Sequence, residues 1–307
     1  MAKSSDNLRE RLVEYAWEAW SALGVAGWRA RSFAAAVDVD ALVLLTGRLG
    51  DEDARLRDES IDWIVANLAL VSRSRLAHLL RDGPGEPGWA AYAGTLQRAT
   101  RQRWPDAGTP FAWKPSGKSR LPERANGATF GLRCRALFGA TARGEVVRAL
   151  VLAGDDREFD ARDLAVEAAY TKRAIAEALE HLRAGGLVTS TAVGNSLRFR
   201  LARRTELEAL LEPLPADRRS QRALLRVGWS ISRAEDATAQ ASERVRLVEG
   251  ARLARELEAD IRSLDPAGAR LTAGPATLEA LREWASEMVA APRAETTGAR
   301  SARRRRA

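Results

Sequence analysis

Apolar side chains recur at intervals of three and four residues through the first hundred positions, which is the spacing of helices with one buried face. Within "DNLRERLVEYAWEAWSALG" this spacing places Leu12, Tyr15 and Trp20 on one side. Seven of the nine tryptophans lie in the first 113 residues. Large rings at helical spacing belong to a core more often than to a ligand-binding or base-stacking platform. We therefore predict a helical N-terminal domain over residues 1–104.

The pattern changes after residue 104. Residues 105–127 are rich in proline, glycine and serine with no sustained period, which is typical of a linker or a long loop. Helical spacing then returns, and "DDREFDARDLAVEAAY" offers Asp160 as a helix N-cap. Helical spacing is also found over residues 205–291. A long helix there, rich in arginine and glutamate, could pair with its copy in a dimer or pack in a bundle within one chain.

"TKRAIAEALEHLRAGGLV", from Thr171 to Val188, predicts a helix followed by a strand. Ile175, Leu179 and Leu182 recur at helical spacing, so one face belongs to the core, and the opposite face is polar. Gly185 and the glycine after it end the helix.

The next segment, "LVTSTAVGNSLRFRLAR", alternates apolar and polar residues around Gly194-Asn195, a two-residue turn suited to a β-hairpin. Its second arm places Leu197, Phe199 and Leu201 on one face and two arginines on the other. The predicted fold class is mainly α, with one small hairpin in the middle of the chain. The arginine-rich tail over residues 292–307 is a charge block of the kind that is usually disordered.

The order helix, helix, helix, "GLV" and hairpin over about residues 142–202 resembles the winged helix-turn-helix domain. "LRAGGLV" is similar to the helix-to-wing transition of bacterial regulators of the MarR and ArsR kind. The turn between the second and third helices reads "EAAYT", where a glycine is common. The resemblance implies a winged helix-turn-helix domain over residues 128–204, between helical N-terminal and C-terminal regions.

The resemblance also implies which residues would meet DNA. A major groove about 12 Å wide admits one helix, and residues near the N-terminus of that helix reach the base edges. A cation there could contact guanine or a phosphate, and a glutamate could accept a hydrogen bond from cytosine N4. The candidate DNA-binding residues are Tyr170, Thr171, Lys172, Arg173 and Glu177 from the recognition helix, and Asn195, Arg198 and Arg200 from the wing.

Charge supports this interpretation through its distribution more than through its sum. The formal net charge is +8, but residues 293–307 hold six arginines and one glutamate, which leaves about +3 for the rest. Residues 143–202 contain nine cations and nine acids, with the acids clustered in residues 155–167 and the cations on the candidate DNA-facing positions. Such polarised charge is typical of a DNA reader. The tail could add affinity for phosphates or play no part.

Several other classes of protein are disfavoured. One cysteine excludes an intramolecular disulfide framework, and no apolar run approaches the roughly 20 residues of a membrane span. The chain lacks G-x-x-x-x-G-K-[ST], G-x-S-x-G and H-E-x-x-H motifs, and its two histidines have no evident partner. We therefore expect a cytoplasmic protein that is not an enzyme, with no cofactor, no metal and no membrane partner.

Sequence-specific binding of double-stranded DNA is the function that these patterns favour, in a bacterial transcriptional regulator. An antitoxin-type repressor of its own operon is one form of it, because winged helices are frequent in such proteins. The helical N-terminal and C-terminal regions would then supply a homodimer contact or bind a protein partner. The alternative is a protein-interaction adaptor, in which the winged helix docks a protein and binds no DNA.

Overall fold

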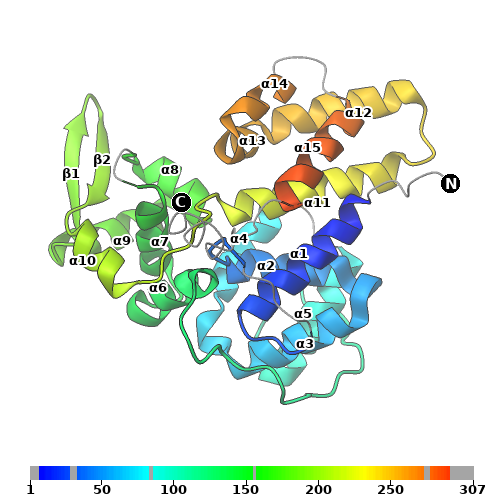
Figure 1. The fold of residues 1–307 in the computed structure, drawn as a ribbon, viewed down its shortest axis with the longest axis horizontal. Coiled ribbons are helices and arrows are strands. Elements are labelled where there is room, and N and C mark those ends of the chain that lie inside the picture. The colour runs from blue at the N-terminus through cyan, green and yellow to red at the C-terminus, as the bar shows by residue number, and fades with distance from the viewer. Residues whose placement is uncertain (1–6, 28–32, 83–85, 155–156, 273–276, 291–307) are drawn as a thin grey trace, which may run out of the picture.

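The structure of the protein is a computed structural model that describes residues 7–27, 33–82, 86–154, 157–272 and 277–290. These residues form a mainly helical fold with one small antiparallel sheet (Figure 1). Within this part of the chain, every helix is too short or too polar to cross a membrane. The helices are α1 (Leu8–Ala22), α2 (Val39–Leu49), α3 (Ala54–Ala66), α4 (Arg73–Leu79), α5 (Pro87–Thr100), α6 (Phe130–Phe138), α7 (Ala142–Leu152), α8 (Ala161–Ala168), α9 (Lys172–Ala184), α10 (Arg204–Leu210), α11 (Gln221–Thr238), α12 (Glu243–Glu256), α13 (Glu258–Leu264), α14 (Ala269–Thr272) and α15 (Leu278–Ala290), and the strands are β1 (Val188–Val193) and β2 (Ser196–Leu201).

The first five and the last five helices share one hydrophobic core, and we call them together the helical body. α1 packs against α2 on one side and against α11 and α15 on the other. In Figure 1, α11 lies between α1–α5 and the group formed by α12, α13 and α14. Gly228 of α11 faces Leu12 of α1 so closely that a Cβ there would lie 3.0 Å from the leucine. The N-terminal and C-terminal regions that the sequence separates are therefore packed into one unit.

The tryptophans of the first third of the chain are core side chains, as predicted. Trp20 and Trp63 are fully buried, and their rings meet edge to face with centroids 5.3 Å apart. Trp17, Trp89 and Trp104 are also buried. Trp113 is partly buried against the same core, and Trp28 lies outside the described residues.

Residues 105–126 contain no helix or strand, as a long loop would, and they run across α3 and α5. Hydrogen bonds from backbone and side-chain groups of the loop attach it to α3. The indole N–H of Trp113 donates to the carbonyl of Asp58 at 3.1 Å, and the amide of Ser116 donates to Asp62 at 3.1 Å. The loop is therefore a strap along the helical body, and it leads into α6.

Helices α6–α10 and the β1–β2 hairpin form a second core, and we call them the middle module. Ile175, Leu179 and Leu182 of α9 are buried in it, as their spacing predicts. Leu164 of α8 and Phe199 of β2 complete the contact between the helices and the hairpin. The apolar face of α9 therefore packs against this second core, and its polar face points outward.

Six buried charges join the helical body to the middle module, and we call them the charge cluster. Every member is less than 5% exposed, and three acids balance three arginines. Buried charges are tolerated only when they are paired and hydrogen-bonded, and these salt bridges meet that condition. The body supplies Asp38, Asp40 and Arg75, and the module supplies Arg135, Glu145 and Arg148.

Two arginines carry most of the hydrogen bonds in the charge cluster. Arg75 donates to both carboxylate oxygens of Asp38, at 2.5 and 2.7 Å. Arg135 reaches across the junction, because it donates to Asp40 at 2.6 and 2.9 Å and to Glu145 at 2.7 and 2.9 Å. Arg135 therefore holds two acids that come from separate parts of the chain.

The charge cluster makes the stability of the protein depend on pH in the acid range. Burial raises the pKa of Glu145, but the three arginines outweigh it and lower that pKa from 4.5 to about 2. They also hold the pKa of Asp38 well below its usual range, against the effect of its burial. A carboxylate with a lowered folded-state pKa stabilises the fold fully above its unfolded-state pKa, and this contribution is lost as the pH falls through the folded-state value. We therefore expect the free energy of unfolding to fall as the pH drops from 4.5 towards 2.

Urea unfolding followed by far-UV circular dichroism at several pH values would measure this dependence. The Glu145→Gln variant is the control, because it has no carboxylate to protonate at that position. It should be less stable than the wild type near neutral pH and should lose less stability on acidification. A profile with the same slope as the wild type would show that Glu145 does not contribute to the effect.

Candidate nucleic-acid interface

Helices α8 and α9 are joined by a tight turn that positions the outward face of α9. α8 begins at Asp160, whose carboxylate accepts from the backbone N–H groups of Arg162 and Asp163 at 2.8 Å, so the predicted N-cap is confirmed. Ala169 follows α8 with a φ of 53°, a left-handed conformation that favours glycine. An alanine there costs about 1–2 kcal/mol, and it makes the turn for which the resemblance leads us to expect a glycine. Thr171 then caps α9 by accepting from the N–H of Ala174 at 3.1 Å.

The first two turns of α9 carry most of the candidate residues from this helix. Lys172, Arg173 and Glu177 are exposed, and so is the Thr171 cap. Arg173 is 90% exposed and lies 3.0 Å from Glu177, one turn further on. The structure therefore brings these four residues together on one outward surface.

The hairpin stands beside α9, and its register is fixed by pairing from Val188 with Leu201 to Val193 with Ser196. Gly194 at the tip has a φ of 57°, which suits the two-residue turn that the sequence predicts. A single bridge pairs Phe159, just before α8, with Phe199 of β2 and ties the hairpin to the helices.

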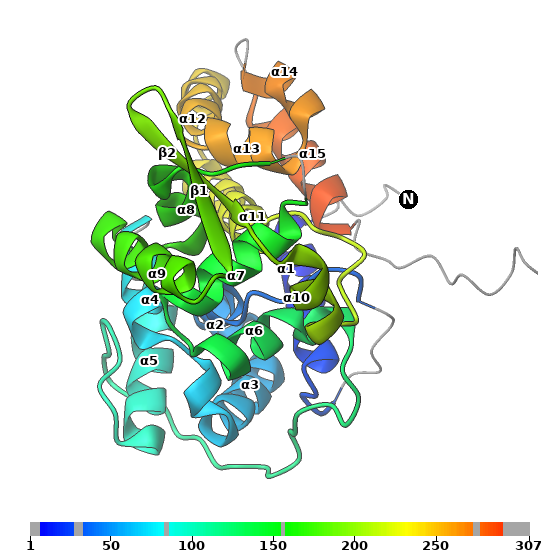
Figure 2. The same ribbon diagram turned by 90° about the vertical axis from the view of Figure 1, so that its left-hand side faces the viewer.

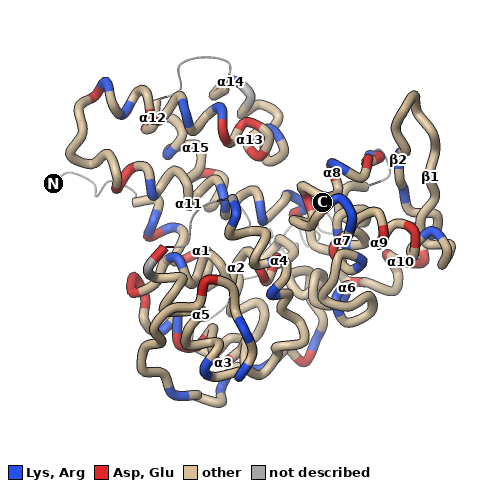
Figure 3. The backbone as a smooth tube through the Cα atoms, turned by 180° about the vertical axis from the view of Figure 1, so that it is seen from behind, with Lys and Arg blue, Asp and Glu red and all other residues tan. Residues whose placement is uncertain are grey.

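The three wing candidates have different surroundings. Asn195 lies exposed at the tip, and Arg200 is exposed on β2. Arg198 turns towards α8, where it lies 3.6 Å from a carboxylate oxygen of Asp163 and 4.0 Å from one of Asp160. The tube in Figure 3 shows blue segments and no red segment on the hairpin, so its charge is wholly positive. Arg198 is thus the most constrained of the three.

An open groove of about 540 Å³ runs between α9, the start of α8 and β2. Lys172 and Arg183 line its α9 wall, and Arg162 lines its α8 wall. Both additional arginines are exposed, and neither is among the candidates taken from the sequence. The spacing of eleven residues between Lys172 and Arg183 is three helical turns, so it places both on one face. This spacing in the sequence therefore indicates Arg183 as a further candidate.

Tyr170 does not belong to the outward surface. Its hydroxyl lies 2.7 Å from that of Ser72, at the start of α4, and its ring lies 6.3 Å from that of His78. Burial raises the pKa of the Tyr170 phenol. Local sequence gives no signal for this contact, because Ser72 and His78 lie about a hundred residues earlier in the chain. We therefore remove Tyr170 from the candidate DNA contacts and assign it to the junction with the helical body.

Arg75 of the charge cluster also contacts the segment that precedes α9, because its Nε donates to the carbonyl of Ala168 at 2.7 Å. That carbonyl belongs to the last residue of α8. Contacts with α4 therefore hold the end of α8, the turn and the start of α9 in place.

Among the described residues, no group of three or more histidine, cysteine, aspartate and glutamate side chains is placed to hold a metal ion. No family model, curated protein or solved structure matches this chain. What this surface can bind follows from its own side chains.

Proposed function

We propose that the protein binds double-stranded DNA sequence-specifically, through a winged helix-turn-helix domain formed by the middle module. The observation that carries the proposal is the first turn of α9, where Lys172 and Arg173 are exposed beside a hairpin of wholly positive charge. In Figure 2 the hairpin faces the viewer with α8 and α9 beside it. In this arrangement, α9 enters the major groove and the hairpin lies along the backbone or in the minor groove.

The dimensions and chemistry of α9 support this role. Its 13 residues span about 20 Å, and its diameter suits a major groove about 12 Å wide. The exposed pair of Arg173 and Glu177 contributes little in water, so it can be exchanged for contacts with DNA. Arg173 would then reach guanine or a phosphate, and Glu177 would accept from cytosine N4.

A bacterial-type transcriptional regulator is the biological form that we propose, and a repressor that controls its own operon is one version of it. Residues 143–202 carry equal numbers of cations and acids, so one copy alone would bind weakly. We propose that two chains act together as a homodimer, or that a protein partner binds the helical body. An antitoxin would bind its toxin in this second way.

An adaptor that docks a protein is the second candidate, and one observation favours it. Val193 and Leu197 near the hairpin tip are 54% and 50% exposed. Apolar side chains at such a tip are suited to a protein surface. In this case α9 and the hairpin would bind a protein and no DNA.

The test is fluorescence anisotropy of the full chain with the DNA upstream of its gene and with a scrambled duplex, at several salt concentrations. We expect tighter binding to the upstream DNA, with an affinity that falls as salt is raised. The Lys172→Ala/Arg173→Ala variant should lose at least about fivefold in affinity, because one good base contact contributes about 1–3 kcal/mol.

The control variant is Arg244→Ala/Arg255→Ala, which removes two exposed arginines of α12 and hence the same charge. It should bind as the wild type does. A chain truncated after Pro292 measures the contribution of the tail. If both duplexes bind equally and binding disappears only with the tail, the DNA-reading proposal is wrong and the adaptor is favoured.

A further inference from the structure

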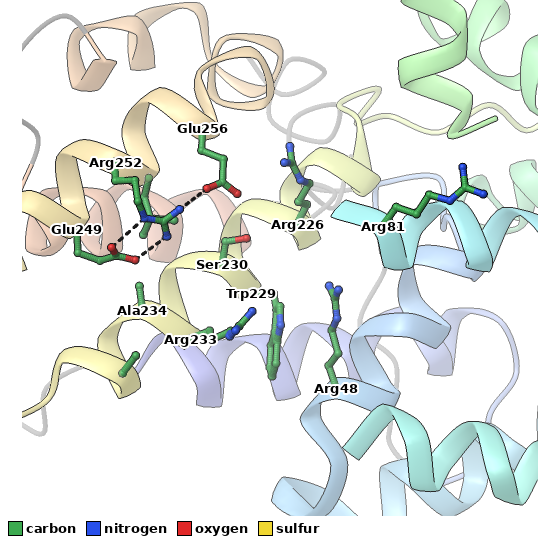
Figure 4. A pocket seen from close by; sticks show the side chains of 12 residues that line it. Arg48, Arg81, Arg226, Trp229, Ser230, Arg233, Ala234, Glu249, Arg252 and Glu256 are labelled. Atoms are coloured by element: carbon green, nitrogen blue, oxygen red, sulfur yellow. Dashed lines mark hydrogen bonds and ion pairs between the residues drawn. The ribbon is translucent and has the colours of Figure 1, made fainter. Parts of the chain in front are cut away.

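A pocket of about 430 Å³ lies on the helical body, away from the candidate nucleic-acid interface (Figure 4). Its walls come from α2, the segment after α4, α11 and α12. Five arginines and two glutamates line it, which leaves the lining with a net charge of +3. We call it the arginine pocket. Its volume lies within the range of about 300–1,000 Å³ that is usual for small-molecule sites.

The positive charge of the arginine pocket is only partly neutralised. Arg252 is paired twice within the pocket, with Glu249 at 2.6 Å and Glu256 at 2.5 Å, as the dashed lines in Figure 4 mark. Arg233 lies 3.4 Å from Glu86 at the edge. Arg81 is exposed and has no ion pair with the residues that the structure describes.

The base of the pocket is built around α11. Arg226 pairs with Asp260 from behind, and its Nε is buried with no hydrogen-bond partner among the described residues. Trp229 is 4% exposed and is fixed by a hydrogen bond from its indole N–H to Glu86 at 3.2 Å. Figure 4 shows Arg48 rising from α2 beside this ring. A small apolar cavity of about 30 Å³ adjoins the same three side chains, Arg48, Arg226 and Trp229.

We propose that the arginine pocket binds a small polyanion that carries phosphate groups. Guanidinium groups match phosphate oxygens with paired, charge-assisted hydrogen bonds. The arginines come from separate segments and surround one space, so a ligand with several closely spaced anionic oxygens can contact more than one of them. A carboxylate has only two oxygens, so it would contact fewer of these arginines.

Isothermal titration calorimetry of the full chain with inorganic pyrophosphate tests the proposal at constant ionic strength. We expect saturable binding at one site per chain. The Arg81→Ala/Arg233→Ala variant should raise the Kd at least tenfold, and because both side chains are exposed it should fold as the wild type does. Arg48→Ala provides a second variant from a different wall and should also weaken binding.

The control is Arg101→Ala/Arg143→Ala, which removes two exposed arginines that do not line the pocket. It should leave the Kd unchanged, and an equal loss in this control would reduce the effect to net charge and overturn the proposal. Citrate tests the phosphate chemistry, because it carries similar charge on carboxylates. Pyrophosphate binding tighter than citrate supports the proposal, and citrate binding as tight or tighter overturns it. No DNA is present, so the result does not depend on the proposed DNA binding.

Discussion

Replacing Arg75 by methionine is expected to lower the free energy of unfolding by about 3–5 kcal/mol, the cost of removing one partner from a buried salt bridge. Arg75 is fully buried and holds both carboxylate oxygens of Asp38. Methionine preserves much of the side-chain volume but donates no hydrogen bond. The substitution leaves Asp38 with Arg148 as its nearest cation, at 3.7 Å. Urea unfolding followed by circular dichroism measures the loss.

The matched control is Arg173→Met, since Arg173 also forms an ion pair but on the surface of α9. Exposed pairs add little stability, so this variant should have the same free energy of unfolding as the wild type within experimental error. Adding Asp38→Leu to Arg75→Met should recover part of the loss, because it removes the stranded charge. If Arg75→Met is as stable as Arg173→Met, the charge cluster does not hold the two parts of the protein together.

Replacing Trp63 by alanine is the second large effect that we expect, at about 3–5 kcal/mol of unfolding free energy. Trp63 is fully buried against the ring of Trp20, and its indole N–H donates to the carbonyl of Leu23 at 2.9 Å. Alanine leaves both a cavity and an unsatisfied buried carbonyl. Chemical denaturation followed by far-UV circular dichroism measures the loss without depending on tryptophan fluorescence.

Trp113→Ala makes the same chemical change at a partly buried position and serves as the comparison. It should cost clearly less than Trp63→Ala, because less of the ring is removed from water. Equal costs would mean that the N-terminal rings do not form a tightly packed core. A ligand-binding role for the N-terminal tryptophans would then have to be considered again.

The local structure of the middle module could be predicted from the sequence because its signals lie close together along the chain. Asp160 stands where an N-cap is needed, and Ile175 and Leu179 repeat at the spacing of a buried helix face. Gly194 supplies the positive φ of the hairpin turn. Each of these signals concerns residues within one or two turns of each other, where backbone geometry decides the outcome.

The long-range arrangement could not be predicted in the same way. Asp40 and Arg135 lie far apart in the chain, and nothing in the local pattern distinguishes a buried acid or arginine from an exposed one. The sharing of one core by the first and last helices depends on which apolar faces meet, and helical spacing does not specify that. Tyr170 was misassigned for the same reason, because its partner Ser72 belongs to a distant helix.

The charge cluster also has a geometric consequence for a paired form of the protein. Arg75 of the cluster, together with Ser72, holds the turn just before α9 against α4 through hydrogen bonds, so α9 has no hinge of its own. In a homodimer that reads DNA, the distance between the two α9 helices would then be set by the dimensions of the whole chain. Paired reading helices match half-sites about 34–36 Å apart, one turn of DNA. Such a dimer would bind half-sites at one fixed spacing, and inserting a single base pair between the half-sites would put one helix out of register.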